Sequence, residues 1–228
     1  MAIMRDKNWV LGLVAAAGLL TALPSRTPAS PQEGLAPSEQ KKVDPASADS
    51  LDQKLQMMRQ RHADGVASAQ RYDVTEEEAN AYLLYRLSAQ FPAEVTEPWV
   101  RFSEDRIQGG AMLDMKLLQA YLGDSMLSSY LEGQVPLEVL AKVRGEGGVG
   151  QVEFESVTLA GIPIPQTLID RLLSDASKSP TLPEGVRLGD AFPLPYSLTS
   201  ARVRTGKLIL RQGGTARDAQ AQLGSPTQ

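Results

Sequence analysis

The chain has 228 residues and carries 23 lysines and arginines against 27 aspartates and glutamates, a formal net charge of −4. This acidic balance argues against nucleic acid as a partner, because phosphate recognition requires a cationic surface that displaces counterions. The sequence has no cysteine, which excludes disulfides, thiolate metal sites, cysteine nucleophiles and a lipid anchor on cysteine. His62 is the single histidine, so the chain has one side chain for histidine-based catalysis and too few for a multi-histidine metal site. Composition therefore predicts a protein that is not an enzyme and that binds no metal or other cofactor.

Residues 1–29 have a cationic start followed by an apolar run, which is typical of a signal peptide or an N-terminal membrane anchor. Met1–Asn8 is mildly cationic through Arg5 and Lys7, and Trp9–Leu23 contains no charged residue. The uncharged run lies at the upper limit of a signal-peptide core, roughly 7–15 residues, and is shorter than the ~20 residues that span a bilayer comfortably. We therefore expect an exported protein that is periplasmic or anchored to the membrane by this segment. Cleavage and retention of the segment both stay open.

The rest of the chain divides into a linker, a domain and a tail. Residues 30–47 are rich in proline, serine, alanine and glutamine without apolar periodicity, and they predict a flexible linker. Residues 48–212 carry periodic apolar patterns and predict a single domain. The polar stretch 213–228 predicts a disordered tail. If the N-terminal segment is retained, the linker becomes a membrane tether.

The domain opens with a predicted helix over Asp49–Arg71, which contains no proline and is rich in good helix formers. Apolar or small residues recur along it at alternating spacings of three and four. These are Leu51, Leu55, Met58, His62, Gly65, Ala69 and Tyr72. We favour packing of this stripe on its own domain, with His62 as a packing or surface residue. A protein partner bound through the 49–71 helix is the alternative.

A second helix is predicted to start at Thr75. Thr75 as N-cap and Glu78 three residues later form a capping box, and the acidic first turn complements the helix dipole. Ala79, Tyr82 and Leu83 are expected on its buried stripe, and the helix is predicted to stop before Phe91-Pro92. Capping accounts for the glutamates, so a metal or acid–base cluster is disfavoured here.

Downstream the apolar period changes from about 3.6 to two, which is typical of strands. Three hairpins are predicted, around the turns Ser103–Asp105, Gly145–Gly148 and Thr205-Gly206. The first includes a long strand from Ile107 to Leu117. In the second, a phase slip near Glu155-Ser156 predicts a β-bulge, which bends a sheet.

Two further helices are predicted between the hairpins, over Gln119–Glu132 and after Pro165, where proline suits the first helical position. The second has an apolar stripe of Leu168, Ile169, Leu172, Leu173 and Ala176. The predicted fold is therefore α+β, a curved antiparallel sheet of β-hairpins wrapped against two or more helices. An aliphatic groove between sheet and helices follows from such an arrangement.

Four phrases resemble a known family: VTEEEANAYLLYRL, VPLEVLAKVRGEGGVGQVEFESVTLAGIPIP, PQTLIDRLL and LPYSLTSARVRTGKLILRQ. They look like bacterial envelope proteins of the tubular lipid-binding (TULIP-like) superfamily, YceB/LmeA-type, over roughly residues 72–212. The resemblance implies binding of acyl chains by interchangeable apolar side chains, so no individual functional residue is carried over. The chain lacks the lipobox cysteine of the lipoprotein members.

No nucleotide-binding, metalloprotease, serine-hydrolase or calcium motif occurs in the sequence. We therefore predict a non-catalytic envelope protein that binds a lipid or other apolar small molecule between sheet and helices. The alternative is a membrane-tethered scaffold or assembly protein that binds a protein partner. The candidate groove residues, each also explained as closed core, are Leu113, Met115, Leu117, Val139, Phe154, Leu168 and Leu172.

The last predicted hairpin is locally basic through Arg202, Arg204, Lys207 and Arg211. These side chains could face anionic lipid head groups. Ordinary solubilising charge on an edge of the sheet is the favoured interpretation.

Overall fold

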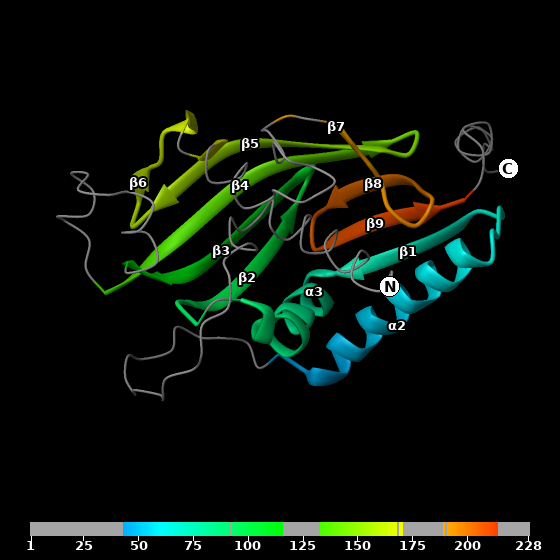
Figure 1. Ribbon diagram of the computed structural model, residues 1–228, viewed down its shortest axis with the longest axis horizontal. Helices are drawn as coiled ribbons and strands as arrows, with labels where there is room; N and C mark the ends of the chain where they lie inside the picture. The colour runs from blue at the N-terminus through cyan, green and yellow to red at the C-terminus, as the bar shows by residue number, and fades with distance from the viewer. Residues whose placement is uncertain are drawn as a thin grey trace, which may run out of the picture.

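The computed structural model describes residues 43–91, 93–115, 133–167, 169–170, 189 and 191–213. Figure 1 shows an open antiparallel sheet with the helices α2 and α3 packed at one end. Nine strands make up the described sheet, in the order β1–β9–β8–β4–β3–β2, and β5 pairs with the opposite edge of β4. This arrangement confirms the predicted α+β class, with a curved sheet built from hairpins.

The helices are α2 (Pro45–Ala63) and α3 (Glu76–Tyr82), and α3 continues into a π-helical turn over Leu83–Leu87. The strands are β1 (Gln70–Thr75), β2 (Val95–Ser103), β3 (Arg106–Asp114), β4 (Gln134–Glu146), β5 (Val149–Leu159), β6 (Ile162–Pro163), β7 (Ala191–Pro193), β8 (Leu198–Arg204) and β9 (Lys207–Gln212).

The bounds of α2 correct the sequence prediction at both ends. Asp44 caps the helix by accepting a hydrogen bond from the Ala46 backbone, and Pro45 occupies the first helical position, inside the predicted linker. The helix does not continue to Arg71, because Gly65 adopts a φ of 64° that a helix cannot contain. The following residues instead form β1, which pairs with β9. Pairing with a strand far along the chain overrode the local helix propensity.

The apolar stripe of α2 packs on its own domain, as favoured. Leu51, Leu55 and Met58 are buried in the main core. His62 is exposed near the end of the helix and does not continue that core contact. The expected seam therefore ends at Met58, and Tyr72 joins the core from β1 rather than from a helix.

The predicted capping box at the start of α3 is confirmed, and its glutamate does more than cap. The Glu78 backbone donates to Thr75 Oγ1 at 3.1 Å, and the Thr75 backbone donates to Glu78 Oε2 at 2.9 Å. Lys54 Nζ of α2 lies 2.6 Å from Glu78 Oε1, and it also donates to the Asp73 carbonyl of β1. The Ser50 hydroxyl donates to Glu78 as well. Glu78 thus joins α2, α3 and the edge strand β1.

The other edge of the sheet, β2, is closed by side chains of α3. The Asn80 amide accepts from the Val100 backbone at 2.8 Å and donates to the Val100 carbonyl at 2.7 Å, so it pairs as a neighbouring strand would. Glu76 Oε2 accepts from the Phe102 backbone at 2.8 Å. The edge of β2 is therefore occupied at Val100 and Phe102, which hinders pairing with another chain there.

We expect Asn80→Leu to lower the free energy of unfolding by about 2 kcal/mol, because two half-buried backbone groups of Val100 lose their partners. Chemical denaturation measures this change, and Gln90→Leu, at an exposed position just after the helix, is the control. Amide exchange at Val100 should accelerate in the same variant. Unchanged exchange at Val100 would mean that Asn80 does not close the strand edge.

The three hairpins form at the predicted turns, but the strand expected from Ile107 to Leu117 is shorter, because β3 ends at Asp114. Gly147 and Gly148 have φ values of 60° and 82° in the two-residue turn between β4 and β5. Ala141 pairs with Phe154 and Leu140 pairs with Ser156, so Glu155 is the extra residue of the expected bulge.

The sheet divides at β4 into two arms, one made of β3 and β2 and the other of β8, β9 and β1. One edge of β4 pairs with β3 over Gln134–Lys142 and then with β8 over Arg144–Glu146. Asp105, with a φ of 56°, lies at the fork, where its backbone bonds Val143 and Val203. The helices cover the arm that contains β1, β9 and β8 (Figure 1).

A buried amide joins the elements of this helix-covered arm. Gln212 at the end of β9 is 1% exposed, and its Nε2 donates to the carbonyls of Met58 and Tyr196, both at 2.7 Å. The Tyr72 hydroxyl donates to Gln212 Oε1 at 3.2 Å. One side chain therefore connects α2, β1, β9 and the turn that precedes β8.

Candidate functional site

The other arm of the sheet carries a second apolar cluster, separate from the core beneath the helices. Neither α2 nor α3 contributes a residue to it. The second cluster consists of Val95, Ala111, Leu113, Met115, Val135, Leu137, Val139, Val157, Leu159 and Ile169.

Strand alternation places these side chains on one face. On β3 and β4 the odd-numbered residues are buried, and their even-numbered neighbours are at least partly exposed except Gly110, which Trp99 covers on the opposite face. Leu113 pairs with Val95 on one side and with Val135 on the other, so the three side chains form a row across the sheet. The register between β3 and β4 is regular throughout, whereas the pairing of β2 with β3 shifts between Thr96 and Trp99.

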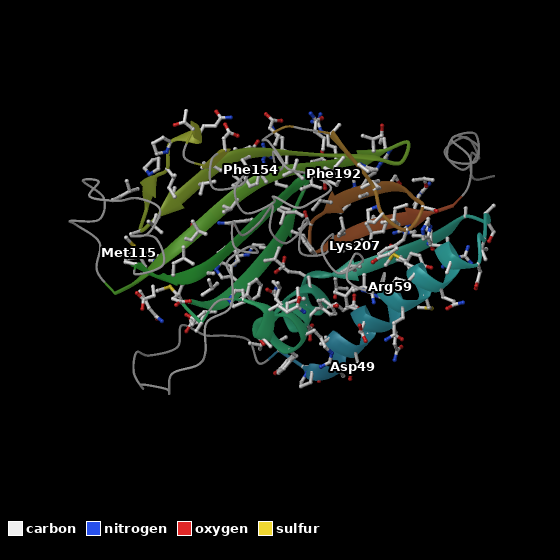
Figure 2. All side chains as sticks on the ribbon, in the orientation of Figure 1. Asp49, Arg59, Met115, Phe154, Phe192 and Lys207 are labelled. Carbon is white, nitrogen blue, oxygen red and sulfur yellow. The ribbon has the colours of Figure 1, made fainter. Side chains whose placement is uncertain are left out.

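The structure brings together three of the predicted groove residues. Leu113, Met115 and Val139 are 2%, 1% and 1% exposed and belong to the second cluster. Phe154 is partly buried and packs against both clusters, next to the bulge at Glu155. In Figure 2, Met115 and Phe154 lie toward the arm of the sheet that is away from Arg59 of α2.

The remaining predicted groove residues, Leu117, Leu168 and Leu172, lie outside the described residues. So does the helix expected over Gln119–Glu132. Of the apolar stripe expected after Pro165, Ile169 is described, and it is buried in the second cluster. Its backbone donates to the Pro165 carbonyl at 3.2 Å, as in a helical turn.

Six residues of the second cluster on the strands were not selected from the sequence: Val95, Ala111, Val135, Leu137, Val157 and Leu159. Three of them, Ala111, Val135 and Leu137, could have been found from the alternation of β3 and β4 and their shared register. Val95 lies on β2, at the far side of an irregular pairing with β3. Val157 and Leu159 follow the bulge, and their phase became interpretable only once the extra residue was placed.

The second cluster contains no ionisable side chain. Among the described residues, the buried polar side chains are Glu78 and Gln212, and both belong to the helix-covered arm. The described part of the chain contains no group of three or more histidines, aspartates or glutamates that could hold a metal ion. Within the same residues, no helix is long and apolar enough to cross a membrane. The arrangement offers apolar contact rather than acid–base chemistry.

Charges on the sheet are arranged in local pairs. Glu155 lies 2.6 Å from Arg106 and 2.8 Å from Lys142, and hydrogen bonds from these two cations hold the pKa of Glu155 at about 2. The bulge therefore presents its extra side chain to cations on β3 and β4. Arg106 and Lys142 are even-numbered residues on the face opposite the second cluster, so the pairing places no charge on the buried face.

The basic hairpin β8–β9 is largely neutralised by neighbouring carboxylates. Arg202 pairs with Glu146 at 2.6 Å, and Arg204 pairs with Glu104. Lys207 lies 3.1 Å from Asp73, whose pKa is lowered to about 2, first by a hydrogen bond from Arg71 and further by Lys207. These pairs support the favoured interpretation of solubilising charge over a free cationic surface.

Comparison with known proteins adds no relative, since no family model, no curated protein and no solved structure matches this chain. The resemblance to tubular lipid-binding proteins therefore stays a prediction from the sequence motifs.

Proposed function

We propose that the protein is a non-catalytic, exported envelope protein that binds a lipid or another apolar small molecule on the second cluster, on the arm of the sheet that α2 and α3 do not cover. The periplasm, or the membrane surface to which residues 1–29 would anchor the chain, is the proposed location. Nucleic acid is not a proposed partner, given the net charge of −4.

The observation that carries the proposal is a continuous aliphatic face across β2, β3, β4 and β5, without a residue of α2 or α3 in the cluster. Burial of acyl chain against such a face provides about 0.8 kcal/mol for each methylene. Side chains there need not be individually specific, because apolar contact is non-directional. An aliphatic lining without ionisable groups suits a hydrocarbon better than a polar metabolite.

Native mass spectrometry and organic extraction of the purified full chain test this proposal. We expect a co-purifying lipid of acyl-chain mass, and saturable binding of the fluorescent fatty acid cis-parinaric acid. Protein that carries no lipid and gives no saturable fluorescence change would contradict the proposal.

Leu113→Trp separates a ligand-lining position from closed core. If Leu113 lines a ligand site, the indole fills ligand volume, and we expect loss of cis-parinaric acid binding with little change in thermal stability. If the cluster is closed core, the indole overpacks it and costs about 1–3 kcal/mol. Met112→Trp, at the adjacent and more exposed position on the opposite face, is the matched control. Destabilisation of Leu113→Trp, together with a parent protein free of lipid, would overturn the proposal.

A scaffold that binds a protein partner is the second candidate, and a groove beside α2 favours it. The groove has a volume of about 780 Å³ and lies between α2 and β1. Met57 lines it and is 50% exposed, so it offers an apolar contact on the outer face of α2. If lipid is absent, we expect Met57→Asp to abolish binding of any partner through α2 without changing stability.

A further inference from the structure

A second cavity, of about 690 Å³, lies at the C-terminal end of α2 in the helix-covered arm. The end of α2 and the loop after it line one side, and the turn before β8 lines the other. Val66, Leu194 and Leu198 contribute apolar surface, and Arg61, His62 and Ser197 contribute polar groups. None of these six residues belongs to the second cluster.

The single histidine and a serine from the far end of the chain meet at this cavity. Ser197 Oγ lies 2.8 Å from His62 Nδ1, and both side chains are exposed. The serine hydroxyl donates when Nδ1 carries no proton. A nucleophile and a base within hydrogen-bond distance are the first requirement of nucleophilic catalysis.

The backbone at Ser197 is held in a conformation that its residue type disfavours. Tyr196 and Ser197 have φ values of 52° and 56°, and the Leu198 backbone donates to the Pro195 carbonyl at 3.0 Å. A turn with two positive φ angles suits glycine or asparagine. Strained residues of this kind persist only where the surrounding structure determines them, and they concentrate at functional sites.

Contacts with neighbouring residues hold the turn at Tyr196 and Ser197 in this conformation. Tyr196 is buried, its ring contacts the His62 ring edge-on at a centroid distance of 6.2 Å, and its carbonyl accepts from Gln212. The Ser197 carbonyl accepts from the Gly213 backbone at 3.1 Å. The hydroxyl of Ser197 is thus presented to the cavity by a rigid turn, with the imidazole positioned by the neighbouring ring.

Arg61 lines the same cavity and brings a positive charge to it. Its guanidinium donates to the Ser68 carbonyl at 2.7 Å and to the Ser68 hydroxyl at 3.0 Å. Its Nε is buried and has no hydrogen-bond partner in the described part of the chain. A cation that faces a carbonyl oxygen under attack stabilises the negative charge that develops on it, and Arg61 is the cationic lining residue of this cavity among the described residues.

We infer that Ser197 is a nucleophile, with His62 as its general base, for small esters that carry an apolar acyl group. Ser197 Oγ bonds to the ester carbonyl carbon, its proton passes to His62 Nδ1, and the alcohol leaves with that proton as the carbonyl re-forms. Water then cleaves the acyl-serine, releasing the carboxylic acid and restoring the hydroxyl. This activity uses a different face from the proposed lipid site, so lipid binding and ester hydrolysis are tested independently. Demonstrated hydrolysis would replace the non-catalytic part of the proposed function and leave its lipid-binding part in place.

The test is reaction of the full chain with a fluorophosphonate probe, followed by intact mass and peptide mapping, together with hydrolysis of p-nitrophenyl butyrate. We expect one adduct, on Ser197. Ser197→Gly should abolish the adduct and the hydrolysis while keeping the fold, because glycine adopts the positive φ without strain. Ser88→Ala removes an exposed serine that does not line this cavity and should react as the parent protein does.

His62→Asn distinguishes catalysis from a structural role, because its amide can keep a hydrogen bond to Ser197 but cannot accept a proton. We expect labelling and hydrolysis to slow by about 100-fold or more at unchanged thermal stability. His62→Ala, at an exposed position, is the second variant and should lose the same activity. An unlabelled Ser197, or labelling that is as fast in both His62 variants as in the parent, would overturn the inference.

Discussion

Glu78→Gln is expected to lower the free energy of unfolding by about 3 kcal/mol, because it leaves the ammonium of Lys54 without its carboxylate. The two side chains are 10% and 23% exposed, so water replaces the lost partner poorly. Glutamine keeps the volume and can still cap α3, which confines the change to charge. Urea denaturation followed by circular dichroism measures the effect.

The matched control is Glu77→Gln, on the same helical turn with the same loss of charge. Glu77 is exposed, and its contact with Ser47 is long at 3.4 Å. We expect a cost below about 1 kcal/mol there, from the helix dipole alone. The double variant Lys54→Met with Glu78→Gln should be less destabilised than the sum of the single variants. Equal effects of Glu77→Gln and Glu78→Gln would show that the ion pair does not stabilise the junction.

The same pair makes part of the stability depend on pH. Burial alone raises the pKa of Glu78, but hydrogen bonds from Lys54, Ser50 and Thr75 outweigh it and lower the pKa below its ordinary value of 4.5. The folded state therefore favours the ionised carboxylate. Its contribution is present above the unfolded-state pKa and is lost as the pH falls through the folded-state pKa. The stability difference between the parent protein and Glu78→Gln should shrink on acidification below 4.5.

Gln212→Leu should destabilise the protein by a similar amount, about 3 kcal/mol. Leucine keeps most of the volume but leaves the Met58 and Tyr196 carbonyls without their donor, in a site that is 1% exposed. Each buried polar group without a partner costs about 1–3 kcal/mol. Thermal and chemical denaturation measure the loss.

Gln70→Leu is the control for this change, since Gln70 pairs directly with Gln212 across β1 and β9 but is exposed. It should alter stability by less than about 0.5 kcal/mol. Because Gln212 also holds the turn at Tyr196, we expect faster amide exchange at Leu198 in Gln212→Leu. If Gln212→Leu were as stable as the parent protein, the hydrogen bonds of the Gln212 amide would not stabilise the fold.

Short-range patterns decided much of the architecture before any tertiary contact was known. The Thr75–Glu78 capping box, the Gly147-Gly148 turn and the bulge at Glu155 were all identifiable, because each depends on residues within a few positions of one another. Alternation along β3 and β4 likewise identified Leu113 and Val139 as inward-facing.

The error at the end of α2 has the opposite cause. Residues up to Arg71 have good helix propensity, but β1 gains its backbone hydrogen bonds by pairing with β9. The two strands are far apart in the sequence: Tyr72 and Gln212, whose side chains are hydrogen-bonded, are 140 positions apart. Local sequence carries no information on that partner. Proline at position 45 misled in the same way, since it suits a linker and a first helical turn equally well.

The sequence alone determined the α+β class, the hairpins and one apolar face per strand, because strand period and turn chemistry are local properties. Only the tertiary structure decided how those parts are joined. It separated the second cluster from the core under α2 and α3, placed Asn80 against Val100, and buried Gln212 among four elements. It also brought His62 to Ser197 across 135 positions of sequence. Such contacts depend on the path of the whole chain, and no local pattern encodes which distant residue completes a hydrogen bond.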